Sequence, residues 1–170
     1  KGLKHKEVQV DREHHDKHWR GEHWGKGGTI AQSRARHQQE QGVASAIALA
    51  STLYSAAGNL RSRARGLHII WRLPLASYYL REAVNLCNWA RRTSRAGLTA
   101  DQLDVSASVF RAWAKVPLMV CQRHKYLDRA EGCIRQALEM DPEPGSRLLL
   151  LTSLLQLRDD SSRWVACITY

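Results

Sequence analysis

Apolar side chains recur every three or four residues along most of the chain, from residue 31 to residue 157. This spacing places them on one face of an α-helix. Runs of alternating apolar and polar residues joined by Asn-Gly or Asp-Gly turns, which would indicate β-hairpins, do not occur. The pattern therefore predicts an all-α protein.

The first predicted helix begins at Ala31 and includes an uncharged stretch from Gln41 to Leu60. Gly58-Asn59 predicts its end, because glycine favours the position just past a helix. A stretch of this length could cross a membrane. Alanine and serine dominate it, however, and they contribute little free energy of transfer into lipid. These small side chains favour a helix packed closely inside a bundle.

The second predicted helix covers residues 67–90 and ends in a run of arginines before Gly97. Pro74 is expected to kink or restart this helix, because proline has no amide hydrogen to donate. The third helix should begin with a capping box of Thr99 and Gln102, in which each side chain accepts a hydrogen bond from the other's backbone amide. Its apolar stripe predicts a helix as far as Val120, bent at Pro117. The stripe consists of Leu103, Ala107, Phe110, Trp113, Pro117 and Val120.

Two further helices are predicted near the C-terminal end. Asp128 with Glu131 has the spacing of a second capping box, and Asp141-Pro142 predicts the end of that helix. The last helix should cover Ser146 to Leu157. Its leucines lie nearly all round, so it needs cover on more than one side, from a partner or from residues 164–170.

The segment from Tyr126 to Pro142 resembles the second helix of a tetratricopeptide repeat (TPR). Ala130, Ile134, Ala137 and Pro142 stand at that family's small, bulky, small and proline positions. The resemblance extends to residue 157 and implies antiparallel helix pairs in a TPR-like helical-repeat array with a concave partner-binding face. Within each pair, the alanines would let the second helix press against the first.

Other parts of the chain follow the TPR pattern less closely. The positions aligned with the large, leucine, glycine and aromatic residues of the first helix are Ala114, Pro117, Leu118 and Cys121. Ala83, Cys87 and Ala90 repeat the spacing of Ala130, Ile134 and Ala137. The offset is 47 residues (130 minus 83), whereas the family uses about 34. The best-matched part of the predicted helical domain, residues 31–170, is therefore 110–157.

Residues 1–30 are polar and contain the glycine-rich run Gly25 to Gly28. We expect this segment to be an extended basic arm that lies along a partner. His14 and His18 would share a helix face and are weak candidates for metal ligands, but no third ligand follows at a fixed spacing. A metal-dependent enzyme is accordingly the least favoured hypothesis. No catalytic motif stands out, and we expect no enzymatic activity and no cofactor.

The net charge of +10 is concentrated in the first 97 residues. Residues 42–97 contain eight arginines and one glutamate, which gives +7, whereas residues 98–170 contain nine basic and nine acidic residues. Such a surface favours an anionic partner, although a solvated face without a partner is the alternative. The expected partner contacts are Lys17, Arg20, Trp24, Arg61, Arg63, Arg65, Arg91, Arg92 and Arg95.

The four cysteines form no Cys-x-x-Cys pair, and Cys87, Cys121 and Cys133 lie in apolar helical stretches. We interpret them as buried free thiols, which predicts a reducing intracellular compartment, whether cytosolic or organellar. The sequence as a whole predicts a non-catalytic scaffold subunit that binds other protein subunits of a larger complex. The alternatives are an RNA-binding subunit of a ribosome-like ribonucleoprotein and a subunit of a membrane-associated complex.

Overall fold

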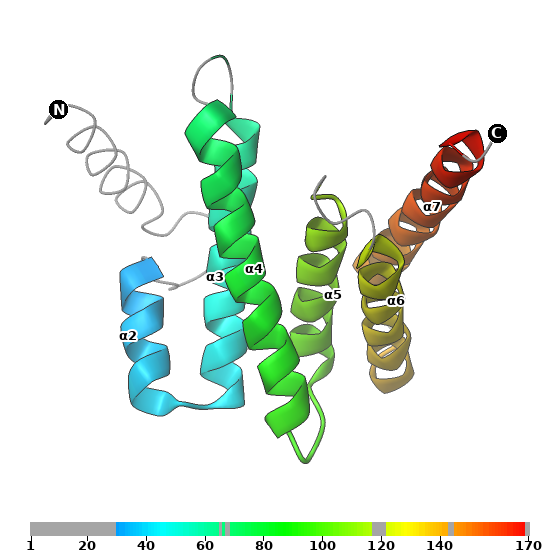
Figure 1. The fold of residues 1–170 in the computed structure, drawn as a ribbon. Coiled ribbons are helices and arrows are strands. Elements are labelled where there is room, and N and C mark those ends of the chain that lie inside the picture. Colours follow the sequence, from blue (N-terminus) through cyan, green and yellow to red (C-terminus); the bar gives the residue numbers. More distant parts are fainter. Residues whose placement is uncertain (1–29, 65, 67–68, 117–121, 143–144, 169–170) are drawn as a thin grey trace, which may run out of the picture.

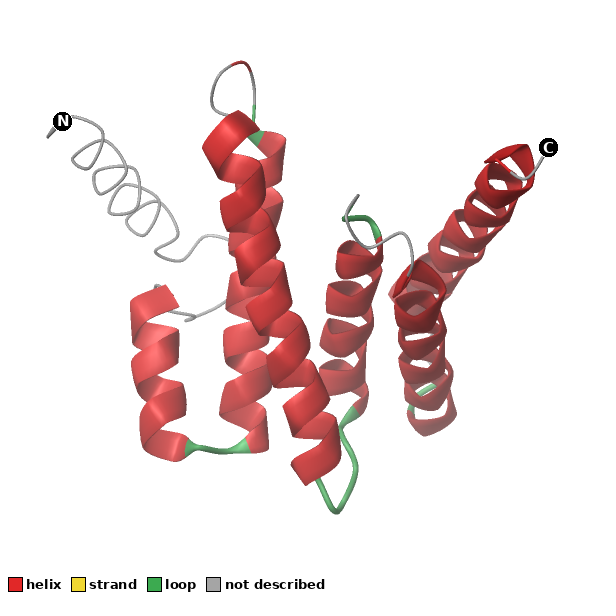
Figure 2. Cartoon of the chain, in the orientation of Figure 1, coloured by secondary structure: helices red, strands yellow, loops and turns green. Residues whose placement is uncertain are grey.

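The computed structural model describes residues 30–64, 66, 69–116, 122–142 and 145–168. The described residues form six α-helices and no strand, so the all-α prediction is confirmed (Figures 1 and 2). Neighbouring helices run in alternating directions. The helices are α2 (Ile30–Glu40), α3 (Val43–Ser62), α4 (Ile69–Thr93), α5 (Ala100–Ala114), α6 (Arg123–Met140) and α7 (Gly145–Ile168).

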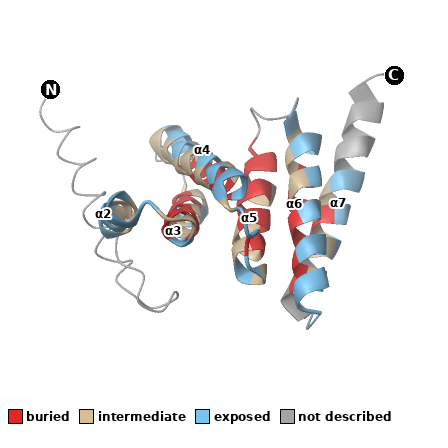
Figure 3. Ribbon diagram, turned by 90° about the horizontal axis from the view of Figure 1, so that it is seen from below, coloured by how far each residue is buried: buried red, intermediate tan, exposed pale blue. Residues whose placement is uncertain are grey.

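The most extensive packing is between α3 and α4 and between α5 and α6, which makes two helical hairpins. Both α3 and α4 also contact α5, and α7 packs mainly against α6. The buried faces of α3, α4, α5 and α6 turn toward one another (Figure 3), and their side chains form one continuous hydrophobic core.

Three residues on α4 and three on α6 that share the repeat spacing are fully buried. All six are 0% exposed: Ala83, Cys87 and Ala90 on α4, and Ala130, Ile134 and Ala137 on α6. Each set lies on the second helix of its hairpin. Small side chains at these positions let the helix backbones approach closely. Pro142, the fourth residue of the repeat pattern, is exposed and follows the end of α6.

The first predicted helix starts within one residue of its predicted start at Ala31, but its continuity and its predicted end are wrong. The chain breaks between α2 and α3 at Gln41, whose φ of 44° is left-handed, and Gly42 becomes the N-cap of α3. The Ser45 hydroxyl accepts a hydrogen bond from the Gly42 amide at 3.2 Å and stabilises this start. At its other end α3 continues through Gly58 to Ser62, because Leu60 is a buried core residue that packing keeps helical.

Proline affects the next helices in different ways. Pro74 does not restart α4, which is one helix from Ile69 to Thr93. Pro74 is exposed near the start of α4, where a missing amide removes a single hydrogen bond. In contrast, α5 ends at Ala114, before the predicted Val120. The residue before a proline is driven out of the helical conformation, which ends α5 short of Pro117. Residues 117–121 lie outside the described residues.

The cap at the start of α5 is as predicted, and the start of α6 is not. The Gln102 amide donates to the Thr99 hydroxyl at 3.4 Å, and the Thr99 amide donates to the Gln102 side chain at 3.1 Å. Helix α6 begins at Arg123, one turn and a half before Asp128. Buried Leu127 keeps this first part of α6 on the core. The predicted end at Asp141 is confirmed, since Asp141 is the C-cap residue.

The last helix is longer than predicted, because α7 continues to Ile168. Residues 164–168 thus extend α7 and do not fold back to cover its leucines. Leu154 is buried, whereas Leu148 and Leu155 are exposed. The predicted arm, residues 1–30, lies outside the described residues apart from Ile30, which begins α2.

Candidate anion-binding surface

The structure places the predicted arginine contacts in two groups at opposite ends of the α3–α4 hairpin. Arg61 and Arg63 lie where α3 ends, and Arg91, Arg92 and Arg95 lie at and just beyond the end of α4. The two helices run antiparallel (Figure 1). From Ile69 to Arg91 is 22 residues, or about 33 Å along the helix axis. The groups therefore form two separate basic surfaces. The other predicted contacts, Lys17, Arg20, Trp24 and Arg65, lie outside the described residues.

The only carboxylate between residues 42 and 97 is already paired with an arginine from another helix. Glu82 on α4 accepts two hydrogen bonds from Arg34 on α2, at 2.5 and 3.2 Å. This contact raises the pKa of the Arg34 guanidinium above its ordinary value. Among the described ion pairs, none neutralises Arg61, Arg63, Arg91, Arg92 or Arg95. The positive charge of both ends therefore remains uncompensated by these contacts.

A further group of cations was missed by the sequence reasoning. Arg111 and Lys115 lie at the end of α5, and Arg123 begins α6, at the end of the bundle where Arg61 also lies (Figure 1). Burial lowers the pKa of the Lys115 ammonium, and the nearby charges of Arg111, Arg61 and Arg123 lower it further. Like charges disfavour one another's charged forms at short range. These four residues, from three helices, are called the basic end below.

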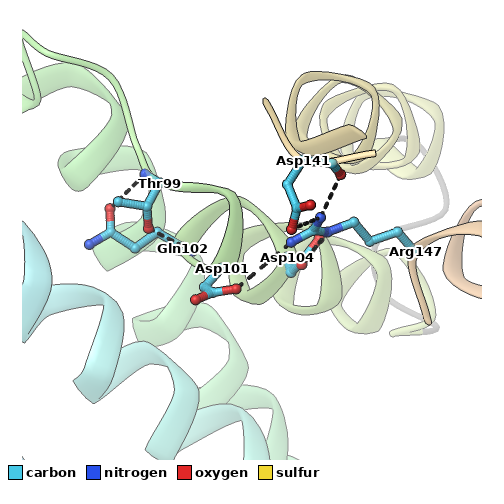
Figure 4. Close-up of polar contacts among 6 residues, drawn as sticks. All are labelled: Thr99, Asp101, Gln102, Asp104, Asp141 and Arg147. Atoms are coloured by element: carbon cyan, nitrogen blue, oxygen red, sulfur yellow. Dashed lines mark hydrogen bonds and ion pairs between the residues drawn. The ribbon is translucent and has the colours of Figure 1, made fainter. Parts of the chain in front are cut away.

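The basic end escaped prediction because residues 98–170 carry no net charge. The structure separates the opposite charges within that region. Arg147 forms ion pairs with three of the carboxylates in this region (Figure 4). Its Nε lies 2.7 Å from Asp104 and one Nη 2.9 Å from Asp141, while Asp101 is 3.8 Å away. Hydrogen bonds to Asp104 and then Asp141 raise the pKa of Arg147.

Arg158 on α7 takes two more carboxylates from α6, at 3.4 Å from Asp128 and 3.0 Å from Glu131. Glu131 also pairs with Arg135 at 2.7 Å. These acids are therefore engaged by arginines other than those of the basic end. The overall neutrality of the C-terminal half therefore conceals an anionic cluster around Arg147 and a cationic cluster at the basic end.

The first turn of α6 adds to the cationic character of the basic end. It contains no acidic residue and reads Arg123, His124, Lys125. The N-cap residue, Gln122, makes no side-chain capping hydrogen bond. Arg123 is half-buried, and its Nε has no hydrogen-bond partner among the described residues. Acidic caps usually offset the positive end of a helix, and here cations occupy that position.

Exposed apolar side chains lie along the first half of α4. Ile70 is 74% exposed and Tyr78 58% exposed, and Leu73, which lies one turn after Ile70, is 40% exposed. Trp71 is half-buried, and the guanidinium of Arg72 stands 5.0 Å above its ring. The guanidinium of Arg72 also donates a hydrogen bond to the Arg63 carbonyl oxygen. Apolar and basic groups therefore adjoin where α3 ends and α4 begins.

Cys87 and Cys133 are buried free thiols, as predicted. Burial raises the pKa of Cys87 to about 12, against a smaller opposite effect of a hydrogen bond with Ser106. Burial likewise raises the pKa of Cys133. Thiols of this kind are poor nucleophiles and poor metal ligands at neutral pH. Cys121 lies outside the described residues.

Among the side chains that the structure describes, no three His, Cys, Asp or Glu residues come together as metal ligands. The candidates His14 and His18 lie outside the described part of the chain. Helix α3 is long and apolar enough to cross a membrane, and half of its most apolar window is buried inside the bundle. A core helix meets the same criteria of length and composition, so this is weak evidence for a membrane span.

No protein-family model matches the chain, and neither a curated protein nor a solved structure is similar enough to it to count as a match. Any function of this chain must therefore be inferred from its own residues and their geometry.

Proposed function

We propose that the protein is a non-catalytic scaffold subunit that holds an anionic protein partner within a larger assembly. The observation that carries this proposal is the charge of the α3–α4 hairpin. Eight arginines lie between residues 42 and 97, and the single glutamate there, Glu82, is bound by Arg34. An uncompensated positive surface speeds association with a negative one and selects against positive partners.

The C-terminal end of α4 is the proposed contact with this protein partner. Arg91, Arg92 and Arg95 are all exposed there, within two turns of one another. Guanidinium groups form paired hydrogen bonds with carboxylates, which gives orientation as well as attraction. An acidic protein face therefore has the complementary chemistry.

The packing also supports a helical-repeat scaffold of TPR-like helix pairs. Ala83, Cys87 and Ala90 on α4 correspond in spacing and burial to Ala130, Ile134 and Ala137 on α6. Both sets lie in the common core, and on α4 the Cys87 thiol is hydrogen-bonded with Ser106 of α5. Stacked hairpins of this kind present continuous surfaces to partner proteins, which is the use proposed here.

The proposal is tested by affinity purification of the full chain from the cells that express it, with and without nuclease. Arg91→Gln/Arg92→Gln is the test variant. Arg36→Gln/Arg135→Gln is the control, because it removes the same charge from exposed arginines that already have carboxylate partners.

We expect a defined protein to co-elute after nuclease treatment, to be lost with the test variant and to be kept with the control. The interaction should also weaken as salt rises. Loss of all co-eluting protein on nuclease treatment would replace the scaffold with the RNA-binding alternative. If both variants retained the co-eluting protein equally, the C-terminal end of α4 would be excluded as the contact.

A further inference from the structure

We propose that the basic end, formed by Arg61, Arg111, Lys115 and Arg123, is a binding site for a ligand with several phosphate groups. This site is separate from the proposed protein contact, which lies at the other end of α4. The two proposals are therefore independent, and either can fail without the other.

The position of the four residues follows from the topology. Helices α3 and α5 run in the same direction and pack against each other, so they end on the same side of the bundle. Helix α6 starts on that side because it returns antiparallel to α5. Arg61 lies on the last turn of α3, Arg111 and Lys115 on the last turn and C-cap of α5, and Arg123 on the first turn of α6.

The arrangement is electrostatically unfavourable in the absence of an anion. Arg61, Arg111 and Arg123 are half-buried, and no described ion pair involves any of the four cations. The connecting residues 115–122 contain no aspartate or glutamate. Partly buried charges without a counter-charge are disfavoured. Burial lowers the pKa of Lys115 most, and the repulsion from Arg111, Arg61 and Arg123 lowers it further. A bound anion would relieve the repulsion among all four.

Phosphate suits the site better than carboxylate for two reasons. Guanidinium groups can donate paired hydrogen bonds, and a phosphate group offers three oxygens to them. One Nη of Arg111 already donates to the Ser153 hydroxyl on α7, so Arg111 would donate from its other nitrogens. The start of α6 adds the positive end of the helix dipole, which favours phosphate. Arg123 also contributes a buried Nε with no hydrogen-bond partner among the described residues. The four positive charges exceed the negative charge of one phosphate group. The charge balance therefore favours a ligand with several linked phosphate groups.

The direct test is calorimetric titration of the full-length protein with inorganic tripolyphosphate, followed by a single-stranded RNA oligonucleotide. Arg61→Gln/Lys115→Gln is the test variant. Arg36→Gln/Arg135→Gln is the control, because it removes the same charge from exposed arginines that pair with carboxylates outside both proposed sites. We expect the test variant to bind tripolyphosphate at least about tenfold more weakly than the natural protein, because each charge-assisted contact is strong. The control should bind within about twofold.

The comparison between probes identifies the source of the phosphate. If the oligonucleotide binds more tightly than tripolyphosphate and depends on the same residues, the ligand is a nucleic-acid backbone. If tripolyphosphate binds at least as tightly, the ligand is a free oligophosphate. Either result supports the site. A poly-glutamate peptide that binds as tightly as both probes would overturn the preference for phosphate. Equal loss in both double variants would overturn the location.

A second measurement separates binding from a merely structural role of Lys115. Lys115→Gln removes an ammonium that is repelled by its neighbours, so the thermal midpoint of the unliganded protein should rise by about 1–2 °C. Arg36→Gln, which removes the same charge from an ion pair, should show no rise. Tripolyphosphate should raise the midpoint of the natural protein more than that of Lys115→Gln. A lower midpoint for unliganded Lys115→Gln would contradict the crowding on which the proposal depends.

Discussion

Two glycines, Gly58 and Gly97, provide a test of the fold in which replacement by alanine should change stability in opposite directions. Gly58 lies inside α3, is exposed, and has no atom within 4 Å of the position that a Cβ would occupy. Gly97 lies between α4 and α5, and a Cβ there would also meet open space. The two sites differ in backbone conformation, since the φ of Gly97 is +83°.

The magnitudes follow from the backbone alone, because neither alanine would gain or lose a packing contact. In a helix interior, alanine is more favourable than glycine by about 0.5–1 kcal/mol. Gly58→Ala should therefore raise the free energy of unfolding by that amount. A left-handed conformation is less favourable for an alanine by about 1–2 kcal/mol. Gly97→Ala should lower the free energy of unfolding accordingly.

Thermal unfolding followed by circular dichroism is a sufficient assay. For 170 residues the unfolding entropy is about 0.36 kcal/mol per degree, so 1 kcal/mol corresponds to about 3 °C. We expect a rise of about 1.5–3 °C for Gly58→Ala and a fall of about 3–6 °C for Gly97→Ala. The thermal midpoint of Gly97→Asn should fall less than that of Gly97→Ala, because asparagine tolerates the left-handed region better than alanine. A fall for Gly58→Ala would mean that α3 ends at Gly58-Asn59, as the sequence pattern predicts.

Five other predictions concern the core, a cap and the thiols. Phe110→Ala should lower the free energy of unfolding in urea by about 3–5 kcal/mol, because Phe110 is fully buried. Ala130→Leu should lower it by about 1–3 kcal/mol by overpacking the contact between α5 and α6, whereas a generic exposed alanine would tolerate leucine. Thr99→Ala should lower it by about 1 kcal/mol through loss of the capping box, and chemical denaturation would show this. Mass spectrometry after thiol alkylation at pH 8 should find Cys87 and Cys133 labelled only in the unfolded protein. Since burial raises the pKa of Cys87 to about 12, the unfolded state loses this proton first, and the stability that Cys87 contributes falls as pH rises from about 9 to 12. The alkaline fall of the thermal midpoint should be shallower in Cys87→Ala.

The helical content could be predicted from the sequence because the apolar period is nearly continuous. The helix boundaries were harder to predict, because they depend on the conformation of single residues, which the spacing of apolar residues does not encode. Gln41 adopts a left-handed φ although glutamine rarely does so, and this breaks the first predicted helix in two. Asp128 fits a capping pattern but lies inside α6, where its carboxylate pairs with Arg158.

The basic surfaces were predictable only in part. The surplus of arginine in residues 42–97 indicated the exposed groups at the two ends of the α3–α4 hairpin. The contribution of α5 and α6 was not predictable by counting charges, because their acids and bases cancel in sequence. They separate in space because Arg147 brings Asp104 and Asp141 together at the opposite end of α5 from Lys115. Charge segregation of this kind depends on which helix ends meet, and that is a property of topology.

The unequal lengths of the two hairpins explain how the repeated packing pattern and the exposed apolar residues coexist. Ala83 is the fifteenth residue of α4, whereas its counterpart Ala130 is the eighth residue of α6. Helix α4 thus carries seven additional residues before the pattern, which is about 10 Å or two turns. These two turns extend beyond the end of α5 (Figure 1) and hold Ile70 and Leu73, so no neighbouring helix of the second hairpin covers them. Deleting two turns from the end of α3 would remove the core residues Ala57 and Leu60 together with Arg61, so it should lower the stability of the fold and weaken phosphate binding at the basic end.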